Sequence, residues 1–586
     1  MKSATSLFDF GVFHKTVLRF WPIWAGYTFV WLLLLPVSML GYADSPSRIN
    51  VMSEILGAVD SVSAWLCMIG ACGAAMAAFS HLYSDRAANF FASLPVRREG
   101  MFISCAAAAL LPLLAGNVLT YFASLGVTVA IGVNCGQLLA AWLAVVTLET
   151  IAFFGLAVLC AQLTGHIVIM PLLFIAANVI GSALGNMAHT VPDKFCYGYV
   201  MSSSVWADAL SPLISMVNHV NGRFDSVRET GEISGWSWII AYGVLGVALL
   251  PVSLACYKRR AMESAGDVVA IAPLRPVFKY VCAIAAALLL GDLFFDLLGG
   301  YRSPDGMATA LMYVMCMAAG AFIGYFGAEM LLHKSFGVFS VRKLIGWGVV
   351  CVLGAAFVFG CELDATGYET RVPDPAEVTS VRVQTYGANV VFDDPADIET
   401  MVALHEYAVE NRGSGGYYIQ LDYELDGGGE LKREYSLNEG DGFVTDTLNE
   451  IMNRPDVILE RKYAPRSLTA GQIREAQIYY REPDDDISMA RGIELTSEET
   501  AELYNECILP DMRDGSIGII HYGTDEAYYE QFYDCTIYIS YTGSGGAPMT
   551  ISTSPTVLSS RTNDWLRAHD VPLNTLAETG AEAPAN

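Results

Sequence analysis

The sequence lacks the usual signs of an enzyme. It has no GxxxxGK[ST] phosphate loop, and no Gly-Lys dipeptide occurs anywhere in its 586 residues. It also has no CxxC pair and no His/Cys cluster with the spacing of a zinc site. His405 and Glu406 begin like a zinc-protease helix, but Val409 stands where the second His is needed. We therefore predict no catalytic residue, no metal ligand and no cofactor on this chain.

Charge is scarce in most of the chain and concentrated at its C-terminal end. Residues 362–586 hold 15 Lys and Arg against 42 Asp and Glu, a net charge of −27 in a chain whose total is −26. The first 361 residues balance at +1 and contain nearly all the long apolar runs of a chain that is 53% hydrophobic. This composition predicts two regions that join near Cys361, one embedded in a membrane and one acidic.

The apolar runs predict a polytopic α-helical membrane protein. A membrane-spanning helix needs about 20 mostly apolar residues. Nine runs qualify, and eight or ten are the alternative counts. The nine runs are residues 21–41, 61–80, 102–132, 136–162, 165–185, 235–257, 279–300, 306–332 and 344–361. Pro112 is a candidate kink in the third run.

Basic residues indicate the orientation of these spans. Lys and Arg precede the first run and follow the second, sixth and eighth runs, whereas the alternate loops are mixed or acidic. Because cytoplasmic loops carry the excess of Lys and Arg, the N-terminus is predicted to be cytoplasmic. An odd number of spans then places residues 362–586 outside the cytoplasm. In residues 1–20, Phe10, Phe13, Val17 and Phe20 recur at helical spacing, which predicts an amphipathic helix at the inner membrane interface.

The acidic region predicts an extracytoplasmic α+β domain built from two similar repeats. Alternating strands, hairpin turns and short helices occur twice in the order β-α-β-β-α, over residues 362–470 and 471–573. Residues 574–586 are predicted to be a disordered tail. Cys507 and Cys535 could form a disulfide there, but their spacing does not decide it.

Three acidic residues inside predicted spans are candidates for functional sites. Glu149 lies near the middle of the fourth run, where a charged carboxylate costs about 2.5 kcal/mol or more unless it is protonated, paired or near water. Its two interpretations are a role in a substrate path or helix coupling, and a structural hydrogen bond. Asp292 and Asp296 lie four residues apart on one face of the seventh run. For Asp292 the structural interpretation is preferred, because Gly291 and the nearby outer end of the span lower the cost.

The cytoplasmic loop after the second run carries a family resemblance. Residues 81–99 read as a short amphipathic helix, a Pro-fixed turn and a basic re-entry into the third span. The phrase Ser93–Glu99, Ser-Leu-Pro-Val-Arg-Arg-Glu, is similar to the Leu-Pro-x-(Arg/Lys)-Arg phrase of bacterial ABC type-2 exporter permeases. The resemblance covers an interfacial helix at 1–20 and a six-span unit at 21–257. It implies that this loop docks on a separate ATPase subunit that binds ATP and Mg²⁺, and that the permease is dimeric. The implied docking residues are Arg86, Phe90, Leu94, Pro95, Arg97, Arg98 and Glu99.

The chain departs from the minimal family pattern. A cytoplasmic linker with three further spans at 258–361 and the acidic outer domain are additions, and the whole resembles a bacterial subgroup with a C-terminal domain of unknown function. The resulting hypothesis is an exporter permease of the bacterial plasma membrane that moves a hydrophobic or amphipathic substrate. No nucleic-acid partner is expected. The alternative hypothesis is a membrane-anchored sensor whose outer domain binds an extracellular ligand.

Overall fold

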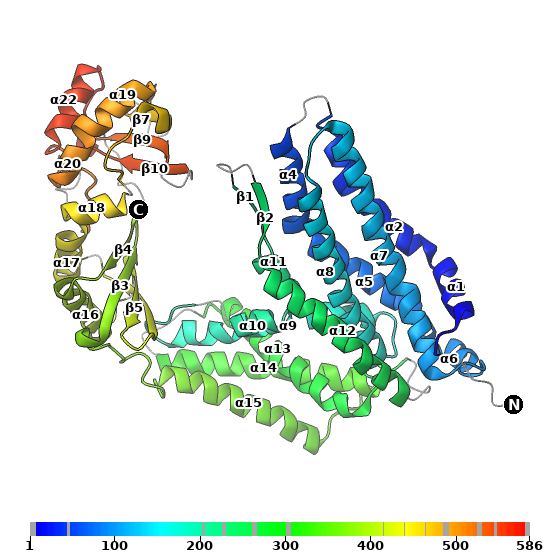
Figure 1. Cartoon of the computed structure of the whole chain (residues 1–586). Helices are drawn as coiled ribbons and strands as arrows, with labels where there is room; N and C mark the ends of the chain where they lie inside the picture. The colour runs from blue at the N-terminus through cyan, green and yellow to red at the C-terminus, as the bar shows by residue number, and fades with distance from the viewer. Residues whose placement is uncertain are drawn as a thin grey trace. The chain divides into compact units, whose positions relative to one another are not determined.

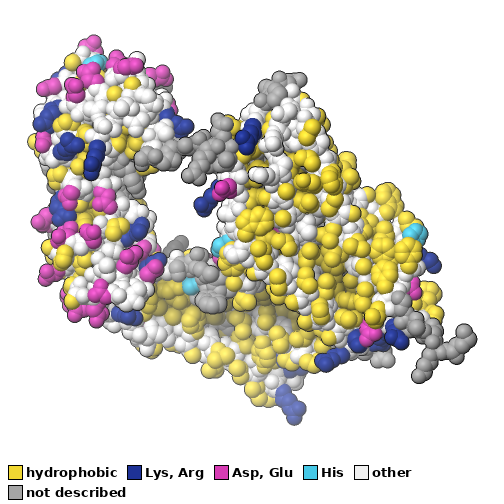
Figure 2. All heavy atoms as spheres, in the orientation of Figure 1, with side chains coloured by type: hydrophobic (Ala, Val, Ile, Leu, Met, Phe, Trp, Pro, Cys, Tyr) yellow, Lys and Arg dark blue, Asp and Glu magenta, His cyan; other side chains and the backbone are white. Residues whose placement is uncertain are grey.

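The computed structural model places the chain in two compact units. Met1–Phe195 and Ser202–Glu362 form one, which we call the helical unit, and Cys196–Met201 and Leu363–Asn586 form the other, which we call the C-terminal unit. The structure describes all residues except 1–6, 44–46, 202–204, 226–229, 261–265, 301–305, 414, 439, 463, 484–490, 524–529, 544–547 and 580–586. Figure 2 shows apolar side chains spread over the helical unit and acidic side chains gathered on the C-terminal unit.

Eight helices of the helical unit, within its described residues, are long and apolar enough to cross a membrane. They are α2–α3 with the intervening π-helix η1 (Trp21–Leu40), α7 (Arg98–Ile131), α8 (Gly136–Leu163), α9 (Ile169–Phe195), α12 (Trp236–Arg259), η5–α13 (Ala272–Leu297), α14 (Gly306–His333) and α15 (Val341–Glu362). Each corresponds to one predicted run. Pro112 lies inside α7, which runs through it as one continuous helix.

The second predicted run is a bent helix pair. Helix α4 (Arg48–Gly57) continues through the π-helix η2 (Ala58–Ser63) into α5 (Ala64–Ala78), and the two arms differ in direction by 51°. If the pair is a single span, the total is nine. The predicted run at 61–80 covered only the second arm, because Arg48, Glu54 and Asp60 make the first arm too polar for a hydropathy criterion.

The remaining elements of the helical unit lie at its ends. At the N-terminus, α1 (Phe10–Arg19) is capped by the Asp9 carboxylate, which accepts a hydrogen bond from Val12 N at 3.0 Å. The connection between α9 and α12 contains α10 (Val205–Ala209), α11 (Pro212–His219) and the hairpin β1 (Gly222–Asp225) and β2 (Thr230–Ile233). Figure 1 shows α11 and the hairpin beside α12. The interfacial role predicted for residues 1–20 stays a prediction for α1.

Small residues allow the long helices to pack closely. A β-carbon at Gly155 of α8 would collide with the backbone of Gly246 in α12, and one at Gly246 would collide with Ile151. Gly320 and Gly324 of α14 face the backbone of α13 in the same way. Close backbone approach of this kind is typical of helices that associate within a membrane. Substituting these glycines would therefore push the helix pairs apart.

The C-terminal unit contains two four-stranded antiparallel sheets with the same topology. The first has β3 (Val378–Thr385), β4 (Ala388–Phe392), β5 (Tyr417–Leu425) and β6 (Glu430–Leu437), in spatial order β4-β3-β5-β6. The second has β7 (Ile473–Tyr480), β8 (Arg491–Glu494), β9 (Cys535–Thr542) and β10 (Pro548–Thr553), in spatial order β10-β9-β7-β8. Helix α16 (Pro395–Glu410) lies between β4 and β5 in the chain. The matching position between β8 and β9 holds α19 (Ser497–Glu502), η8 (Leu503–Ile508) and α20 (Leu509–Arg513).

The predicted order β-α-β-β-α therefore omits one strand from each half, β4 and β8. Strand β4 has five residues and β8 has four, and each lies at an edge of its sheet. After the last strand of each half, helices close the fold: α17 (Gly442–Met452) and α18 (Pro455–Arg461) in the first, and α22 (Ser560–Ala568) in the second. A common origin of the two halves stays a prediction, but their first strands agree in detail. Each is preceded by a three-residue 3₁₀ turn, and each has a register shift after its first residue.

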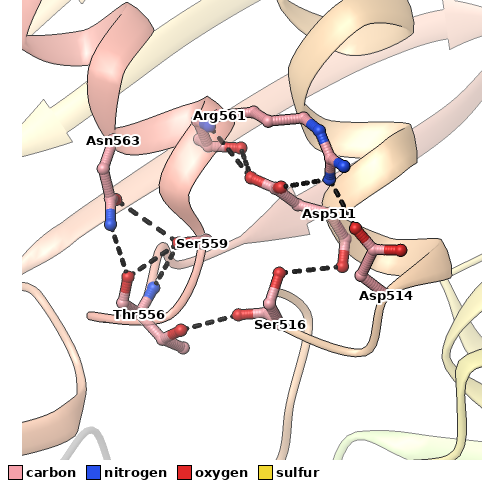
Figure 3. A network of polar contacts seen from close by, with 8 residues as sticks. Asp511, Asp514, Ser516, Thr556, Ser559, Arg561 and Asn563 are labelled. Atoms are coloured by element: carbon pink, nitrogen blue, oxygen red, sulfur yellow. Dashed lines mark hydrogen bonds and ion pairs between the residues drawn. The ribbon is translucent and has the colours of Figure 1, made fainter.

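A buried carboxylate fixes the closing helix of the second half (Figure 3). Asp511 of α20 is 1% exposed, and its Oδ2 accepts hydrogen bonds from Thr562 N at 2.9 Å and from Thr562 Oγ1 at 2.8 Å. Its Oδ1 lies 3.0 Å from Arg561 Nη1. Because the first N–H groups of a helix have no partner within it, Asp511 caps α22 from another helix.

The end of the chain is more ordered than predicted. Residues 575–579 are not a disordered tail, because Leu576 is 6% exposed, donates its N–H to Phe532 O at 3.0 Å and begins the short helix α23 (Leu576–Thr579). Residues 580–586 lie outside the described residues. Cys507 and Cys535 are both free thiols, and burial raises the pKa of Cys507 to about 11 and that of Cys535 to about 12.

A loop from the helical half of the sequence completes the C-terminal unit. Tyr197 follows α9 directly and is 6% exposed. Its N–H donates to Glu369 Oε1 at 2.7 Å, its hydroxyl accepts from Gly413 N at 3.1 Å, and its ring lies 5.2 Å from that of Tyr435. Arg412 lies over the Tyr197 ring and pairs with Glu369 at 2.6 Å. The C-terminal unit is therefore continuous with the chain at two places, after α9 and after α15.

Candidate functional site

The loop with the family resemblance presents an exposed face at one end of the helical unit. It folds as the 3₁₀ helix η3 (Ser80–Tyr83), α6 (Asp85–Ala92) and the first turn of α7, as Figure 1 shows. Phe90 is 62% exposed although it is aromatic, and Arg86, Pro95 and Arg97 are exposed as well. We call these four residues the docking face. They make up four of the seven docking residues that the resemblance implies.

The other three implied docking residues are engaged within the chain. Arg98 donates through Nη1 to the carbonyl oxygen of Lys258 at 3.1 Å. Glu99 Oε1 accepts a hydrogen bond from Lys258 Nζ at 2.6 Å. Lys258 lies in the last turn of α12, where helix carbonyls lack partners and attract a cation such as Arg98. Leu94 is half-buried against the apolar core. Arg98 and Glu99 thus hold the start of α7 against the end of α12.

Arg260 holds the other end of the loop, and sequence reasoning missed this role. The residue is 4% exposed. Its Nη1 donates to the carbonyl oxygens of Ala161 at 3.0 Å and Gln162 at 3.3 Å, and its Nη2 donates to that of Leu82 at 3.1 Å. Burial lowers the pKa of the guanidinium, so carbonyl dipoles rather than water stabilise its charge. One side chain therefore joins η3, just before α6, to the last turn of α8. In the sequence, Arg260 is only one of several basic residues that set the orientation.

A small cavity separates the loop from the helices beneath it. Its volume is about 80 Å³, and its lining includes His81, Phe91, Arg98 and Tyr257. The His81 ring lies 4.6 Å from that of Phe91, and burial lowers the pKa of His81 to about 4. His81 is consequently neutral at physiological pH. The middle of the loop therefore lies over a cavity lined mostly by uncharged side chains, whereas both of its ends are fixed by arginines.

Glu149 is buried in the middle of the helical unit. It is 1% exposed, and its Oε1 accepts a hydrogen bond from Ser63 Oγ at 3.1 Å. Its Oε2 is buried and has no hydrogen-bond partner among the described residues. Ser63 also donates to Val59 O at 2.9 Å, and one hydroxyl proton cannot serve both acceptors. A proton on Glu149 that is donated to Ser63 Oγ satisfies all three groups, which favours a neutral carboxyl here.

Further polar groups extend from Glu149 to three other helical segments. Tyr27 donates its hydroxyl proton to Asn117 Oδ1 at 2.8 Å, and Asn117 Nδ2 donates to Thr150 Oγ1 at 3.2 Å. Thr150 donates to Val146 O at 2.6 Å and also lies 3.5 Å from Cys67 Sγ. Tyr27, Asn117 and Thr150 are buried. Together with Ser63 and Glu149, these side chains form what we call the polar cluster, which connects α2, the bent pair α4–α5, α7 and α8.

The bend between α4 and α5 lies directly at this cluster. Ser63 is the last residue of the π-helix η2, between the two arms of the bent pair. Single π-helical turns inside longer helices occur frequently at functional sites. The only sequence signal for the cluster was Glu149, because Ser, Thr, Asn and Tyr are common in membrane helices and do not stand out singly.

Asp292 and Asp296 make ion pairs with a third residue. Both lie on α13, and their Oδ1 atoms are 2.5 Å and 3.2 Å from Lys194 Nζ near the end of α9. Lys194 also lies over the ring of Phe295. The shared face predicted for the two aspartates therefore connects the three-helix extension to α9. A second group of ion pairs involves Glu329 of α14. This residue is 4% exposed and contacts Lys279 at 3.0 Å, Lys343 at 2.9 Å and His333 at 3.2 Å.

No metal centre accompanies these sites. Among the residues that the structure describes, no group of three or more His, Cys, Asp or Glu could hold a metal ion. The described residues instead form a surface loop fixed to two helix ends, and a polar cluster of five buried side chains inside the helices. No protein-family model, no curated protein and no solved structure matches the chain.

Proposed function

We propose that the chain is the transmembrane permease subunit of an ATP-binding cassette exporter, which moves a hydrophobic or amphipathic substrate. ATP would be bound and hydrolysed by a separate subunit seated on the docking face. The observation that carries the proposal is the structure of the loop at residues 80–99. Phe90 and Arg97 are exposed on the loop, whereas Arg260 and Arg98 anchor its two ends to α8 and α12.

This structure suits the transmission of force. A surface loop that only connects two spans does not need a buried charged anchor such as Arg260, because burying a guanidinium is costly unless its donors are satisfied. The docking face combines an aromatic ring with cations, a combination that is common at the energetic centres of protein interfaces. Displacement of α6 would act on α8, which carries Glu149 and Thr150 of the polar cluster. Two such permease units would enclose the substrate path, as the resemblance implies.

The docking face can be tested by binding. We expect the full-length chain to co-purify with an ATPase subunit from its native membrane. Phe90→Ala combined with Arg97→Glu should weaken that association at least tenfold, because it removes the aromatic anchor and reverses a charge without touching the anchors of the loop. The measurement is the ATPase-to-permease ratio after purification over a range of dilutions. Arg259→Glu is the matched control, since Arg259 is an exposed base at the end of α12 and not on the docking face.

Two outcomes would contradict the proposal. Absence of any co-purifying ATPase would remove its central partner. Equal ATPase binding by wild type and the double variant, with Arg259→Glu also unchanged, would mean that the partner binds elsewhere. Arg98 is unsuitable for this test, because its contact with Lys258 holds α7 in place and its loss would alter the loop itself.

We further propose that the C-terminal unit lies outside the cytoplasm. Helices α9 and α15 both lead directly into this unit, so their C-terminal ends belong on one side of the membrane. This requires an even number of spans between the end of α9 and the end of α15. Helix α12 and the three-helix extension supply four. The basic residues of the alternate loops support a cytoplasmic N-terminus. With that orientation, the bent pair must count as one span for the C-terminal unit to be outside.

A cleavage-site experiment tests this orientation. A protease site inserted at Gly428, in the exposed turn between β5 and β6, should be cut by protease added to intact cells. The same site at Phe336, which is 85% exposed in the loop between α14 and α15, should be cut only after the cells are broken. The reverse pattern would place the C-terminal unit in the cytoplasm and would mean that the bent pair does not cross the membrane.

The second candidate function is a membrane-anchored sensor, and one observation favours it. The face of the first sheet that the helices leave open carries a hollow of about 350 Å³. Its lining includes the cations Arg382 and Lys432 and the carboxylates of Asp422 and Glu424. A polar hollow of this size suits a small zwitterionic ligand better than an apolar one. Retention of ligand-dependent signalling without any ATPase partner would favour this function over transport.

A further inference from the structure

The junction between the two halves of the C-terminal unit holds a buried cation, Arg461, that has no anionic partner among the described residues. Arg461 is the last residue of α18, which ends the first half, and it is 5% exposed. Its Nη2 donates to the carbonyl oxygen of Gly518. Its Nε and Nη1 atoms are buried and have no hydrogen-bond partner among the described residues. Three of its five N–H donors therefore have no acceptor within the described part of the chain.

This situation is unusual within the unit. Other arginines there contact carboxylates: Arg412 with Glu369 at 2.6 Å, Arg454 with Asp397 at 2.6 Å, and Arg481 with Asp534 at 2.9 Å. The unit has an excess of acidic residues, so carboxylates are the commonest possible partners. Arg433 is equally buried and has no carboxylate, but its guanidinium donates to three backbone carbonyls and stacks over Tyr368. Arg461 has one carbonyl and no such ring.

A second cation and a hydroxyl group lie at the same place. Lys462 is half-buried, and its Nζ donates to Ser552 O at 2.7 Å, which leaves further ammonium protons available. Thr553 of β10 is 3% exposed, and its Oγ1 is buried with no partner among the described residues. A β-carbon at Gly518 would lie 3.0 Å from Ile458 Cγ2, 3.8 Å from Thr553 Oγ1 and 3.9 Å from Lys462 Cε, so Thr553 and Lys462 lie beside the residue that Arg461 contacts. Gly518 has a φ of +79°, which keeps a side chain out of this space.

Burial lowers the pKa of both cations, whereas a bound anion would raise it. Burial brings the pKa of Arg461 down to about 10 and, with the neighbouring Arg461, the pKa of Lys462 to about 8. Two like charges side by side in a low-dielectric site destabilise each other, and a counter-ion between them removes the cost. We propose that this junction binds a small inorganic anion, which Arg461, Lys462 and Thr553 hold between the two α+β halves. Chloride and phosphate share the required chemistry, a compact negative charge that accepts several N–H donors.

The anion would join the halves of the C-terminal unit. Arg461 and Lys462 belong to the end of the first half, whereas Gly518 and Thr553 belong to the second. Binding would therefore stabilise the arrangement of the halves, and loss of the anion would loosen α18 and residues 517–523. This inference does not depend on transport or on an ATPase partner.

Hydrogen–deuterium exchange of the full-length chain in detergent tests the site. Exchange in peptides that cover 455–462 and 517–523 is compared in sodium chloride, sodium phosphate and sodium gluconate at one ionic strength. We expect at least threefold slower exchange in chloride, in phosphate or in both than in the bulky gluconate. Slower exchange in chloride alone would identify a monatomic ion, and slower exchange in phosphate alone would identify an oxyanion. Arg461→Gln should abolish the difference, and Arg466→Gln, an exposed cation in the same segment, should preserve it.

A second variant protects the test against misfolding. If Arg461→Gln does not fold, Thr553→Val keeps the volume of the side chain and removes only the hydroxyl, and it should at least halve the effect of the anion. Equal exchange in all three salts for the wild type would overturn the proposal. So would a salt effect of the same size in wild type, Arg466→Gln and the variants of the site, because that would be a general effect of ionic environment.

Discussion

Replacing Arg260 with Ala is expected to separate ATPase binding from ATP-driven work. The docking face does not include Arg260, so the partner should still bind. The carbonyl oxygens of Ala161, Gln162 and Leu82, however, lose their charged donor inside the protein. Each buried acceptor left without a partner costs about 1–3 kcal/mol. We expect η3, and α6 that follows it, to lose its link to α8, and ATP hydrolysis by the reconstituted complex to fall at least tenfold at unchanged ATPase content.

Two further variants make the Arg260 experiment specific. Arg260→Lys keeps the charge, but a single ammonium group cannot reach acceptors that the guanidinium contacts through two separate nitrogens, so it should restore the activity only in part. Arg259→Ala removes the exposed neighbouring base and should have no effect. Normal ATP hydrolysis in Arg260→Ala with intact binding would show that force does not pass through this residue. Loss of ATPase binding in the same variant would show that Arg260 instead shapes the docking face.

The sequence predicted the long apolar helices well and the anchors poorly, for a physical reason. A membrane span is a local property of about 20 successive residues, so each of the eight long helices corresponds to a predicted run. The role of Arg260 depends on Leu82, Ala161 and Gln162, which lie far from it in the chain. No local pattern distinguishes it from exposed Arg259. For the same reason the sequence does not distinguish Arg97 from Arg98, although Arg97 is exposed on the docking face and Arg98 contacts α12.

The C-terminal unit shows the same limit. Its hairpins were predictable because strand alternation and Gly-rich turns are local, as in β5 and β6 around Gly427–Gly429. Strand β4 has only five residues and follows β3 after a two-residue turn at Tyr386 and Gly387, so it merges with its neighbour in the sequence pattern. The contribution of Tyr197 was not predictable at all. A six-residue loop after a membrane helix gives no sign that it packs into a domain whose remaining residues begin after α15.

The polar cluster leads to the second large expected effect, at Glu149. Glu149→Gln keeps the size of the side chain and can donate permanently to Ser63 Oγ, so it imitates the protonated carboxyl and removes the option of losing the proton. If Glu149 serves substrate movement or helix coupling, ATP hydrolysis by the complex should fall at least tenfold, which corresponds to about 1.4 kcal/mol. The free energy of unfolding of the variant should stay within about 0.5 kcal/mol of the wild-type value, because no buried group loses its partner.

Thr150→Val is the matched control for Glu149→Gln. It removes the neighbouring hydroxyl from the same cluster but no ionisable group. Unchanged ATP hydrolysis in Glu149→Gln, with normal expression, would leave the carboxyl a structural link between α8 and the bend at Ser63.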